Sequence, residues 1–132
     1  MSTLTLTWQG DLKFASGEGS PAIELHSSTP TVTSPTQALG YAVMACMAMD
    51  VVHVLQKARH DLRAMSVTFE GTRAPKPPRR YTAIHLHFAI TGDVPNAAVE
   101  RAIELSRTTY CSVSNSLRTD IEFKTTFAIT PS

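Results

Sequence analysis

The stretch SPTQALGYAVMACMAMDVVHVLQKAR, residues 34–59, decides the fold of this chain. Ser34 is a favoured helix N-cap, and Pro35 suits the first helical position. Gln37 stands three residues after the cap, where it can complete a capping box. The residues that follow are apolar on every side of the expected helix, and basic residues stand near its end, where the helix dipole favours them. We therefore predict one long helix that runs to about Arg59.

The segments on either side of this helix predict strands. Before it, Leu4, Leu6 and Trp8 alternate with threonines at period two, and the segments LKFA and PAIELH, set between the turn signals QGD and SGEGS, complete a small meander. After it come the strands LRAMSVTFEGTRA and YTAIHLHFAITG, the amphipathic helix DVPNAAVERAIELSRTT, the turn or short helix YCSVSNSLR, and the strand IEFKTTFAIT. This order predicts an α+β fold, with an antiparallel sheet wrapped around a long central helix in a single domain over residues 1–132.

The composition limits the classes of partner and the compartment. A net charge of +1 argues against a broad nucleic-acid interface. The charged fraction of 17% is slightly low, which hints at a surface buried against another subunit. The opening MSTLTLTWQG has neither a basic start nor an apolar core of a signal peptide, and the apolar run 38–49 ends at Asp50, too short to cross a bilayer. We expect a soluble, cytoplasmic protein without a membrane or nucleic-acid partner.

Cys46, Asp50 and Cys111 are the candidates for chemistry. Taken alone, Cys46 in an apolar helix is a small hydrophobic residue. Cys111 is expected at the start of a short helix, where the dipole favours a thiolate, so the two could form a reactive pair if they meet in space. Asp50 lies one turn after Cys46 on the same helix face, and its charge would oppose thiolate formation. We expect Asp50 to accept hydrogen bonds at a subunit boundary instead.

Other residue patterns give no further site. His85 and His87 share one face of an expected strand, and nothing in the spacing supplies the remaining ligands of a metal site. The segment SGEGS lacks the strand-to-helix setting of a phosphate-binding loop. We expect neither a metal nor a cofactor.

The two cysteine segments together resemble the OsmC/Ohr family of thiol-dependent peroxide-reducing proteins. The first matches that family's central helix, with Ser-Pro, an apolar stretch, Ala-Cys and Asp-Val-Val, and YCSVSNSL is similar to its second cysteine segment. The resemblance implies an intertwined homodimer whose central helices share a core. It also implies that Cys46 is the peroxidatic thiolate that attacks an organic hydroperoxide and that Cys111 is the resolving thiol. An external dithiol would then reset the pair.

The family's activating pair is not found in this chain. The best-characterised members of the family keep an Arg in the N-terminal strands and a Glu just after the proline that opens the helix. In this chain Thr36 and Gln37 follow the proline, where those members have the Glu, and no Arg precedes the helix. Arg80 is the candidate substitute cation, with Lys13 second. The alternative function is a non-catalytic or weakly redox-active dimer that binds a small apolar ligand at the subunit interface.

Overall fold

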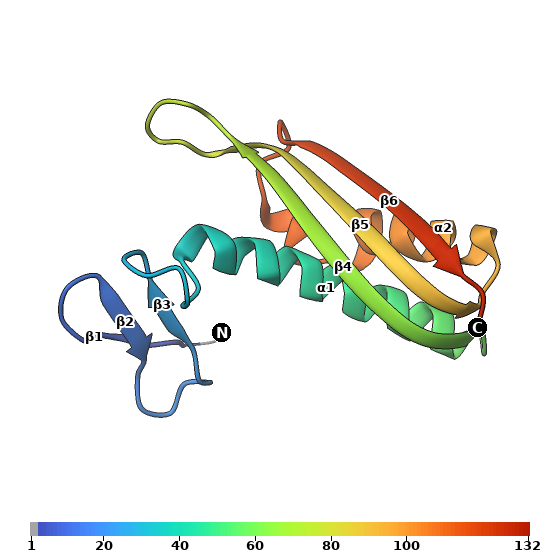
Figure 1. The fold of residues 1–132 in the computed structure, drawn as a ribbon, viewed down its shortest axis with the longest axis horizontal. Helices are drawn as coiled ribbons and strands as arrows, with labels where there is room; N and C mark the ends of the chain where they lie inside the picture. Colours follow the sequence, from blue (N-terminus) through green and yellow to red (C-terminus); the bar gives the residue numbers. More distant parts are fainter. Residues whose placement is uncertain (1–2) are drawn as a thin grey trace. The chain divides into compact units, whose positions relative to one another are not determined.

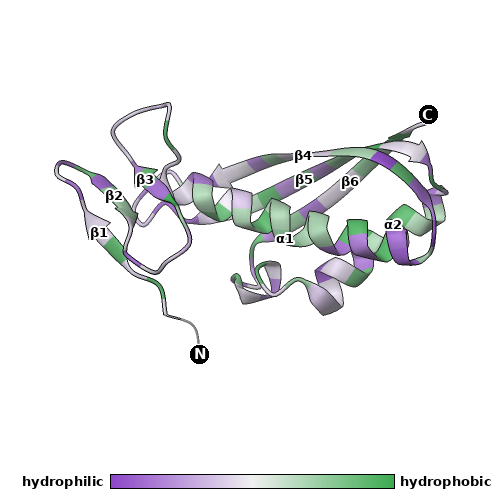
Figure 2. Ribbon diagram, turned by 90° about the horizontal axis from the view of Figure 1, so that it is seen from below, coloured by the Kyte–Doolittle hydropathy of each residue, from purple (hydrophilic) through white to green (hydrophobic). Residues whose placement is uncertain are grey.

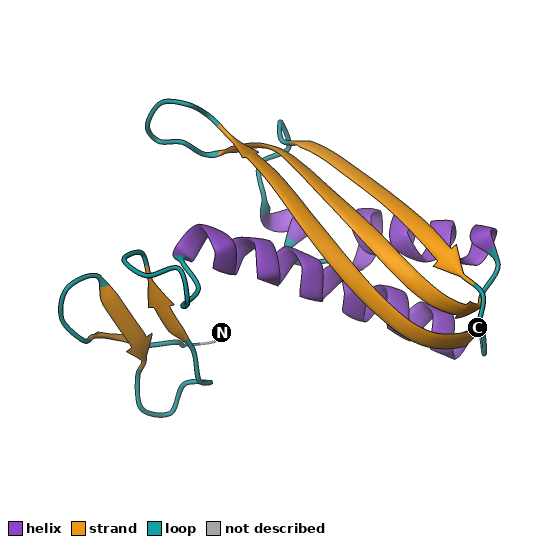
Figure 3. Ribbon diagram, in the orientation of Figure 1, coloured by secondary structure: helices purple, strands orange, loops and turns teal. Residues whose placement is uncertain are grey.

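The computed structural model describes residues 3–132. Met1 and Ser2, which open the stretch examined for a signal peptide, lie outside the described residues. The chain divides into two compact units, Met1–Gly40 and Tyr41–Ser132. Figures 1 and 3 show the elements of both units.

The first unit contains a small antiparallel sheet. Its strands are β1 (Leu6–Trp8), β2 (Lys13–Ser16) and β3 (Glu24–His26), paired in the order β1-β2-β3. This confirms the predicted meander. Apolar side chains of the first strand segment are exposed in the part of the chain that the structure describes, with Leu4 at 74% and Trp8 at 65%.

The long helix α1 (Pro35–Lys57) is capped by side chains at its start and by backbone hydrogen bonds at its end. The capping box forms in both directions: the Ser34 N–H donates to Gln37 Oε1 at 3.0 Å, and the Gln37 N–H donates to Ser34 Oγ at 3.3 Å. At the other end Arg59 adopts a positive φ of 62°, and the N–H groups of Arg59 and His60 donate to the carbonyls of Gln56 and Leu55. That pattern is a Schellman termination, so the helix ends two residues before the predicted limit.

The second unit is built on a mixed sheet of β4 (Asp61–Arg73), β5 (Tyr81–Asp93) and β6 (Glu122–Thr130). β4 and β5 are antiparallel, but β5 and β6 are parallel. The α+β class is confirmed, while the sheet is not antiparallel throughout as predicted. The reason is the connection: α2 (Asn96–Leu105), a π-helical turn (Ser106–Tyr110) and a 3-10 turn (Ser114–Ser116) carry the chain back across the sheet before β6 begins.

The helices lie on one face of this sheet, as the two perpendicular views show (Figures 1 and 2). Hydrophobic residues predominate along α1 in Figure 2. A fully buried stripe at intervals of four residues faces the core, and alternate side chains of β5 belong to the same buried cluster, as their period predicted: Val43, Met47, Val51, Leu55, Ile84, Leu86, Phe88 and Ile90. By length and composition alone α1 would also suit a membrane span, but its buried stripe makes it a core helix.

Candidate active site

The fold brings Cys46, Asp50 and Cys111 into one cluster. Cys46 and Asp50 lie one turn apart on α1, and Cys111 directly follows the π-helical turn. The two sulfur atoms and a carboxylate oxygen of Asp50 all lie within 4.8 Å of one another. Both cysteines are free thiols. The sequence did not show whether Cys46 and Cys111 meet in space. The structure brings them together from two elements that lie far apart along the chain.

Cys46 is half-buried, and its surroundings favour the thiolate. Burial, the largest single influence, raises its pKa. Hydrogen bonds from the Val113 N–H, the Cys111 thiol and the Ser112 hydroxyl outweigh it, and the pKa of Cys46 falls below the usual value for a cysteine. The charge of Asp50 acts in the opposite direction, as its position one turn away predicted. The Ser112 Oγ lies 4.0 Å from Cys46 Sγ.

Cys111 has the opposite character. It is 1% exposed, and burial raises its pKa above the usual value, although its sulfur accepts a hydrogen bond of 3.2 Å from the Ser114 N–H. Its contact with Cys46 raises the pKa further. The predicted dipole-stabilised thiolate at this position is wrong. The turn that follows is only three residues long, so it adds little dipole, and the cysteine itself stands at the C-terminal end of the preceding helical segment.

The π-helical turn holds Cys111 in place. The Cys111 N–H donates to the Ser106 carbonyl at 2.8 Å, five residues back, which is the π-helical spacing. The side-chain amide of Asn115 then donates to the carbonyls of Arg107 and Cys111, at 3.0 and 2.8 Å. This short loop presents the Cys111 thiol, the Ser112 hydroxyl and the Val113 N–H to α1 together.

Asp50 is anchored by Ser106. The Ser106 hydroxyl, which is fully buried, donates a hydrogen bond of 2.8 Å to Asp50 Oδ2. The expectation that Asp50 accepts hydrogen bonds is confirmed, and its place at a subunit boundary stays a prediction. Asp50 also lines an open cavity of about 560 Å³ together with His53, Val54, Lys57, Ala58, Leu105 and Tyr110.

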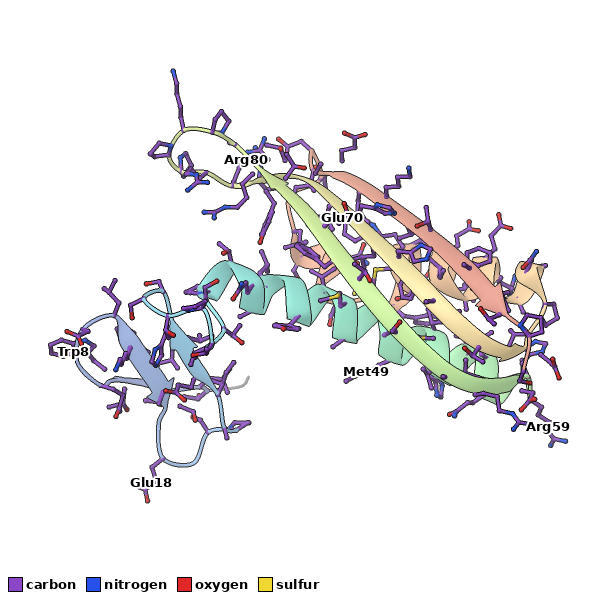
Figure 4. The ribbon with its side chains drawn as sticks, in the orientation of Figure 1. Trp8, Glu18, Met49, Arg59, Glu70 and Arg80 are labelled. Carbon is purple, nitrogen blue, oxygen red and sulfur yellow. The ribbon has the colours of Figure 1, made fainter. Side chains whose placement is uncertain are left out.

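Arg80 lies where the β4–β5 loop enters β5 (Figure 4). Its guanidinium donates to the Tyr81 carbonyl at 3.0 Å and lies 3.5 Å from Asp120 Oδ2. The neighbours that set the pKa of Cys46 are Val113, Cys111, Ser112 and Asp50. Arg80 thus has an acidic partner of its own, and its role in activating the thiol stays a prediction.

Sequence reasoning missed the residues that tune the cluster. Ser106 lies within the expected helix and Ser112 within the expected turn. No sequence motif identifies either serine as a hydrogen-bond donor to a carboxylate or a thiolate. The donor from Val113 is a backbone group, which no side-chain pattern can reveal. His85 and His87, by contrast, stand on the opposite face of the sheet from the core, and both contact Thr126 Oγ1 at 2.8 Å.

Two thiols and a carboxylate are also a possible ligand set for a thiophilic divalent metal ion. Among the described residues this cluster offers three ligand atoms within 4.8 Å of one another, whereas closed structural zinc sites use four. The direct contact between the two thiols and their opposite pKa shifts match the needs of thiol–disulfide chemistry more closely.

The chain resembles known proteins in sequence and in fold. Protein YhfA of Escherichia coli K12 is 44% identical over 82 residues, which cover 61% of this chain and 61% of that relative, so the match spans less than two thirds of its length. A hypothetical protein from Aquifex aeolicus VF5 superimposes with a TM-score of 0.91 at 23% identity, over 100% of this chain and 98% of that one. OsmC, an organic hydroperoxide resistance protein from Legionella pneumophila, superimposes with a TM-score of 0.73 at 20% identity, over 97% of this chain and 98% of that one.

The match to a protein family decides the class. Residues 28–126, well over half of the chain, match the family described as OsmC-like protein. The chain therefore belongs to the OsmC-like family, as the two cysteine segments indicated.

The site predicts unequal reactivity of the two thiols. Because Cys46 is half-buried with a lowered pKa, and Cys111 is buried with a raised one, Cys46 should be alkylated several-fold faster by iodoacetamide at pH 7. Timed alkylation of the reduced protein, followed by peptide mass mapping, measures both rates at once. Ser112→Ala should slow the reaction of Cys46, and Ser66→Ala on β4 serves as the control. Faster labelling of Cys111 would contradict the assignment of the two environments.

Proposed function

We propose that this protein is a thiol-dependent peroxidase that reduces organic hydroperoxides with Cys46 and Cys111. The observation that carries the proposal is one cluster in which a half-buried Cys46 has a pKa below its ordinary value and a buried Cys111 has a pKa above it. Family membership supports it, as does the shared fold with an organic hydroperoxide resistance protein. Resistance to hydroperoxides is a role in defence against oxidative stress.

In the first step the Cys46 thiolate attacks the O–O bond of the hydroperoxide. A sulfur–oxygen bond forms, the O–O bond breaks, and the alkoxide leaves as the alcohol after taking up a proton. Sulfur loses two electrons, and the peroxide gains them. The lowered pKa of Cys46 raises the fraction of thiolate near neutral pH, which is the form that reacts.

In the second step the Cys111 sulfur attacks the sulfenic acid on Cys46. A disulfide forms and water leaves. The two sulfurs lie within 4.8 Å in the reduced protein, so side-chain rotation with a small movement of the loop brings them toward the disulfide length of about 2.05 Å. An external dithiol then reduces the disulfide by exchange, which returns both thiols.

The surroundings favour an organic substrate. Cys46 packs against the hydrophobic core, together with partly buried apolar residues from the following elements, among them Val113 and Leu117. An alkyl or aryl group gains from burial against such a surface, whereas hydrogen peroxide does not. The proposed cycle depends on an external dithiol that returns both cysteines to thiols, so we propose that it takes place in a reducing compartment, the cytoplasm.

The redox pair is tested by a stoichiometric reaction with an organic hydroperoxide. Cumene hydroperoxide added to the reduced protein should produce one Cys46–Cys111 disulfide, detected by mass mapping. Cys46→Ser should abolish peroxide consumption, and Cys111→Ser should let sulfenic acid accumulate on Cys46 or oxidise further. If both thiols of the wild-type protein remain titratable after treatment, the peroxidase proposal fails, and binding of a small apolar ligand becomes the better proposal.

We also propose that the protein acts as a homodimer. Apolar side chains are exposed in both units, with Leu4 at 74%, Trp8 at 65%, Tyr41 at 61% and Met49 at 69%. Met49 projects outward from α1 (Figure 4). Exposed apolar residues along a helix whose opposite side is already buried are typical of a subunit interface.

Sedimentation at micromolar concentration should give about twice the chain mass of 14.4 kDa. Met49→Lys should shift the equilibrium toward the monomer by placing a charge on the apolar surface, and Glu100→Lys on α2 is the control. A wild-type protein that sediments as a monomer would rule out the homodimer and its shared core of two central helices.

Arg80 is proposed as the cation that further stabilises the Cys46 thiolate. On this proposal Arg80→Ala raises the pKa of Cys46 and slows its alkylation at pH 7, because a nearby positive charge favours the anion. Arg79→Ala, the neighbouring arginine of the loop, should change the rate little. Equal alkylation rates in the wild type and both variants would assign the lowered pKa to the hydrogen bonds from Val113, Cys111 and Ser112, and would leave Arg80 to its pairing with Asp120.

A further inference from the structure

The resolving step poses a proton-transfer problem at Cys111. A thiol must lose its proton to attack a sulfenic acid, because the thiolate is the nucleophile. Cys111 is 1% exposed, and its burial raises the pKa, so neither bulk water nor its own acidity supplies the thiolate readily. The leaving hydroxyl on Cys46 also needs a proton to depart as water. The site therefore needs one group that can accept a proton at Cys111 and donate one at Cys46.

The Asp50 carboxylate stands at that position. One of its oxygens lies within 4.8 Å of both sulfur atoms. Within the part of the chain that the structure describes, it is the one acidic group of this cluster. The Ser106 hydroxyl fixes the carboxylate through Oδ2 at 2.8 Å, and a carboxylate offers further lone pairs to other donors. Asp50 also lines the open cavity beside His53 and Lys57, so the residue borders both the thiol pair and this cavity.

We propose that Asp50, positioned by Ser106, is the proton shuttle of the resolving step, which rests on the two-cysteine peroxidase function proposed above. Asp50 takes the proton from the Cys111 thiol as the Cys111 sulfur attacks Cys46. It then delivers that proton to the departing hydroxyl, which leaves as water. One S–S bond and one O–H bond form, one S–O bond and one S–H bond break, and Asp50 returns to the carboxylate without a further reactant.

The electrostatics of the first step support this assignment. The charge of Asp50 raises the pKa of Cys46 and so disfavours the attacking thiolate. A residue with only a structural role, accepting the Ser106 hydroxyl, would serve equally well as a neutral amide. The Asp50 carboxylate thus opposes formation of the Cys46 thiolate in the first step. Its function is in the second step, where it acts as the general base that deprotonates Cys111.

The test is the variant Asp50→Asn, which keeps the size of the side chain and an oxygen that accepts from Ser106. Reduced protein is mixed with one equivalent of cumene hydroperoxide, and aliquots are quenched at increasing times with dimedone, which traps sulfenic acid. Peptide mass mapping then follows both the trapped Cys46 and the Cys46–Cys111 disulfide. Glu100→Gln on the exposed side of α2 is the matched control.

The proposal predicts effects of opposite sign on the two steps. In Asp50→Asn, sulfenic acid should form at the wild-type rate or faster, and iodoacetamide should label reduced Cys46 faster, because an opposing charge is gone. Disulfide formation should slow by about 100-fold or more, the usual size of a lost general acid–base contribution. Ser106→Ala should slow the same step to a smaller extent, since it releases the carboxylate without removing it.

The outcomes separate the two proposals. If sulfenic acid forms in Asp50→Asn and resolves as fast as in the wild type, the shuttle is overturned while the peroxidase function stands. If Asp50→Asn slows both steps together, Asp50 serves the structure of the site, and the shuttle is again overturned. If wild-type Cys46 forms no sulfenic acid and no disulfide, the peroxidase function itself fails and the shuttle with it.

Discussion

The site depends on the burial of one face of α1. Val43, Met47, Val51 and Leu55 are fully buried, and each such side chain contributes about 1.5–3 kcal/mol, so together they fix the rotation of the helix about its axis. Cys46 and Asp50 each precede a member of this stripe by one residue. They therefore stand at its border, partly covered and partly open to solvent, instead of deep inside the core.

The crossover between β5 and β6 supplies the other half of the site. Two neighbouring parallel strands require the chain to return across the sheet, and this chain does so with α2, a π-helical turn and a short loop. The π-helical turn ends at Cys111 and buries the Ser106 hydroxyl beside Asp50. Both the second thiol and the anchor of the carboxylate thus come from one connection that the parallel pairing demands.

The two thiols acquire different chemistry from different solvation. Both lose hydration, but Cys46 receives three hydrogen-bond donors and stays half open, whereas Cys111 is closed off and donates to its partner. A pair of equally acidic thiols would compete for the same role. In the proposed mechanism, this asymmetry suits Cys46 to attack the peroxide and Cys111 to attack the sulfenic acid. If Asp50 is the proton shuttle proposed above, the same carboxylate that disfavours the Cys46 thiolate assists the attack of Cys111 on the sulfenic acid.

The sequence by itself determined the elements, because period and capping are local. The alternation in β5, the Ser34–Gln37 capping box and the strand-helix order were all predictable, and two cysteine segments together indicated the family. The direction of β6 relative to β5 was not predictable from the sequence. Whether two strands pair parallel or antiparallel depends on how the connection between them packs, and not on the residues of the strand itself. The meeting of Cys46 and Cys111 likewise required the tertiary structure, because Cys111 follows Cys46 by 65 positions along the chain. Their pKa shifts depend on backbone and serine donors that take position only once α1, the crossover and the sheet have packed.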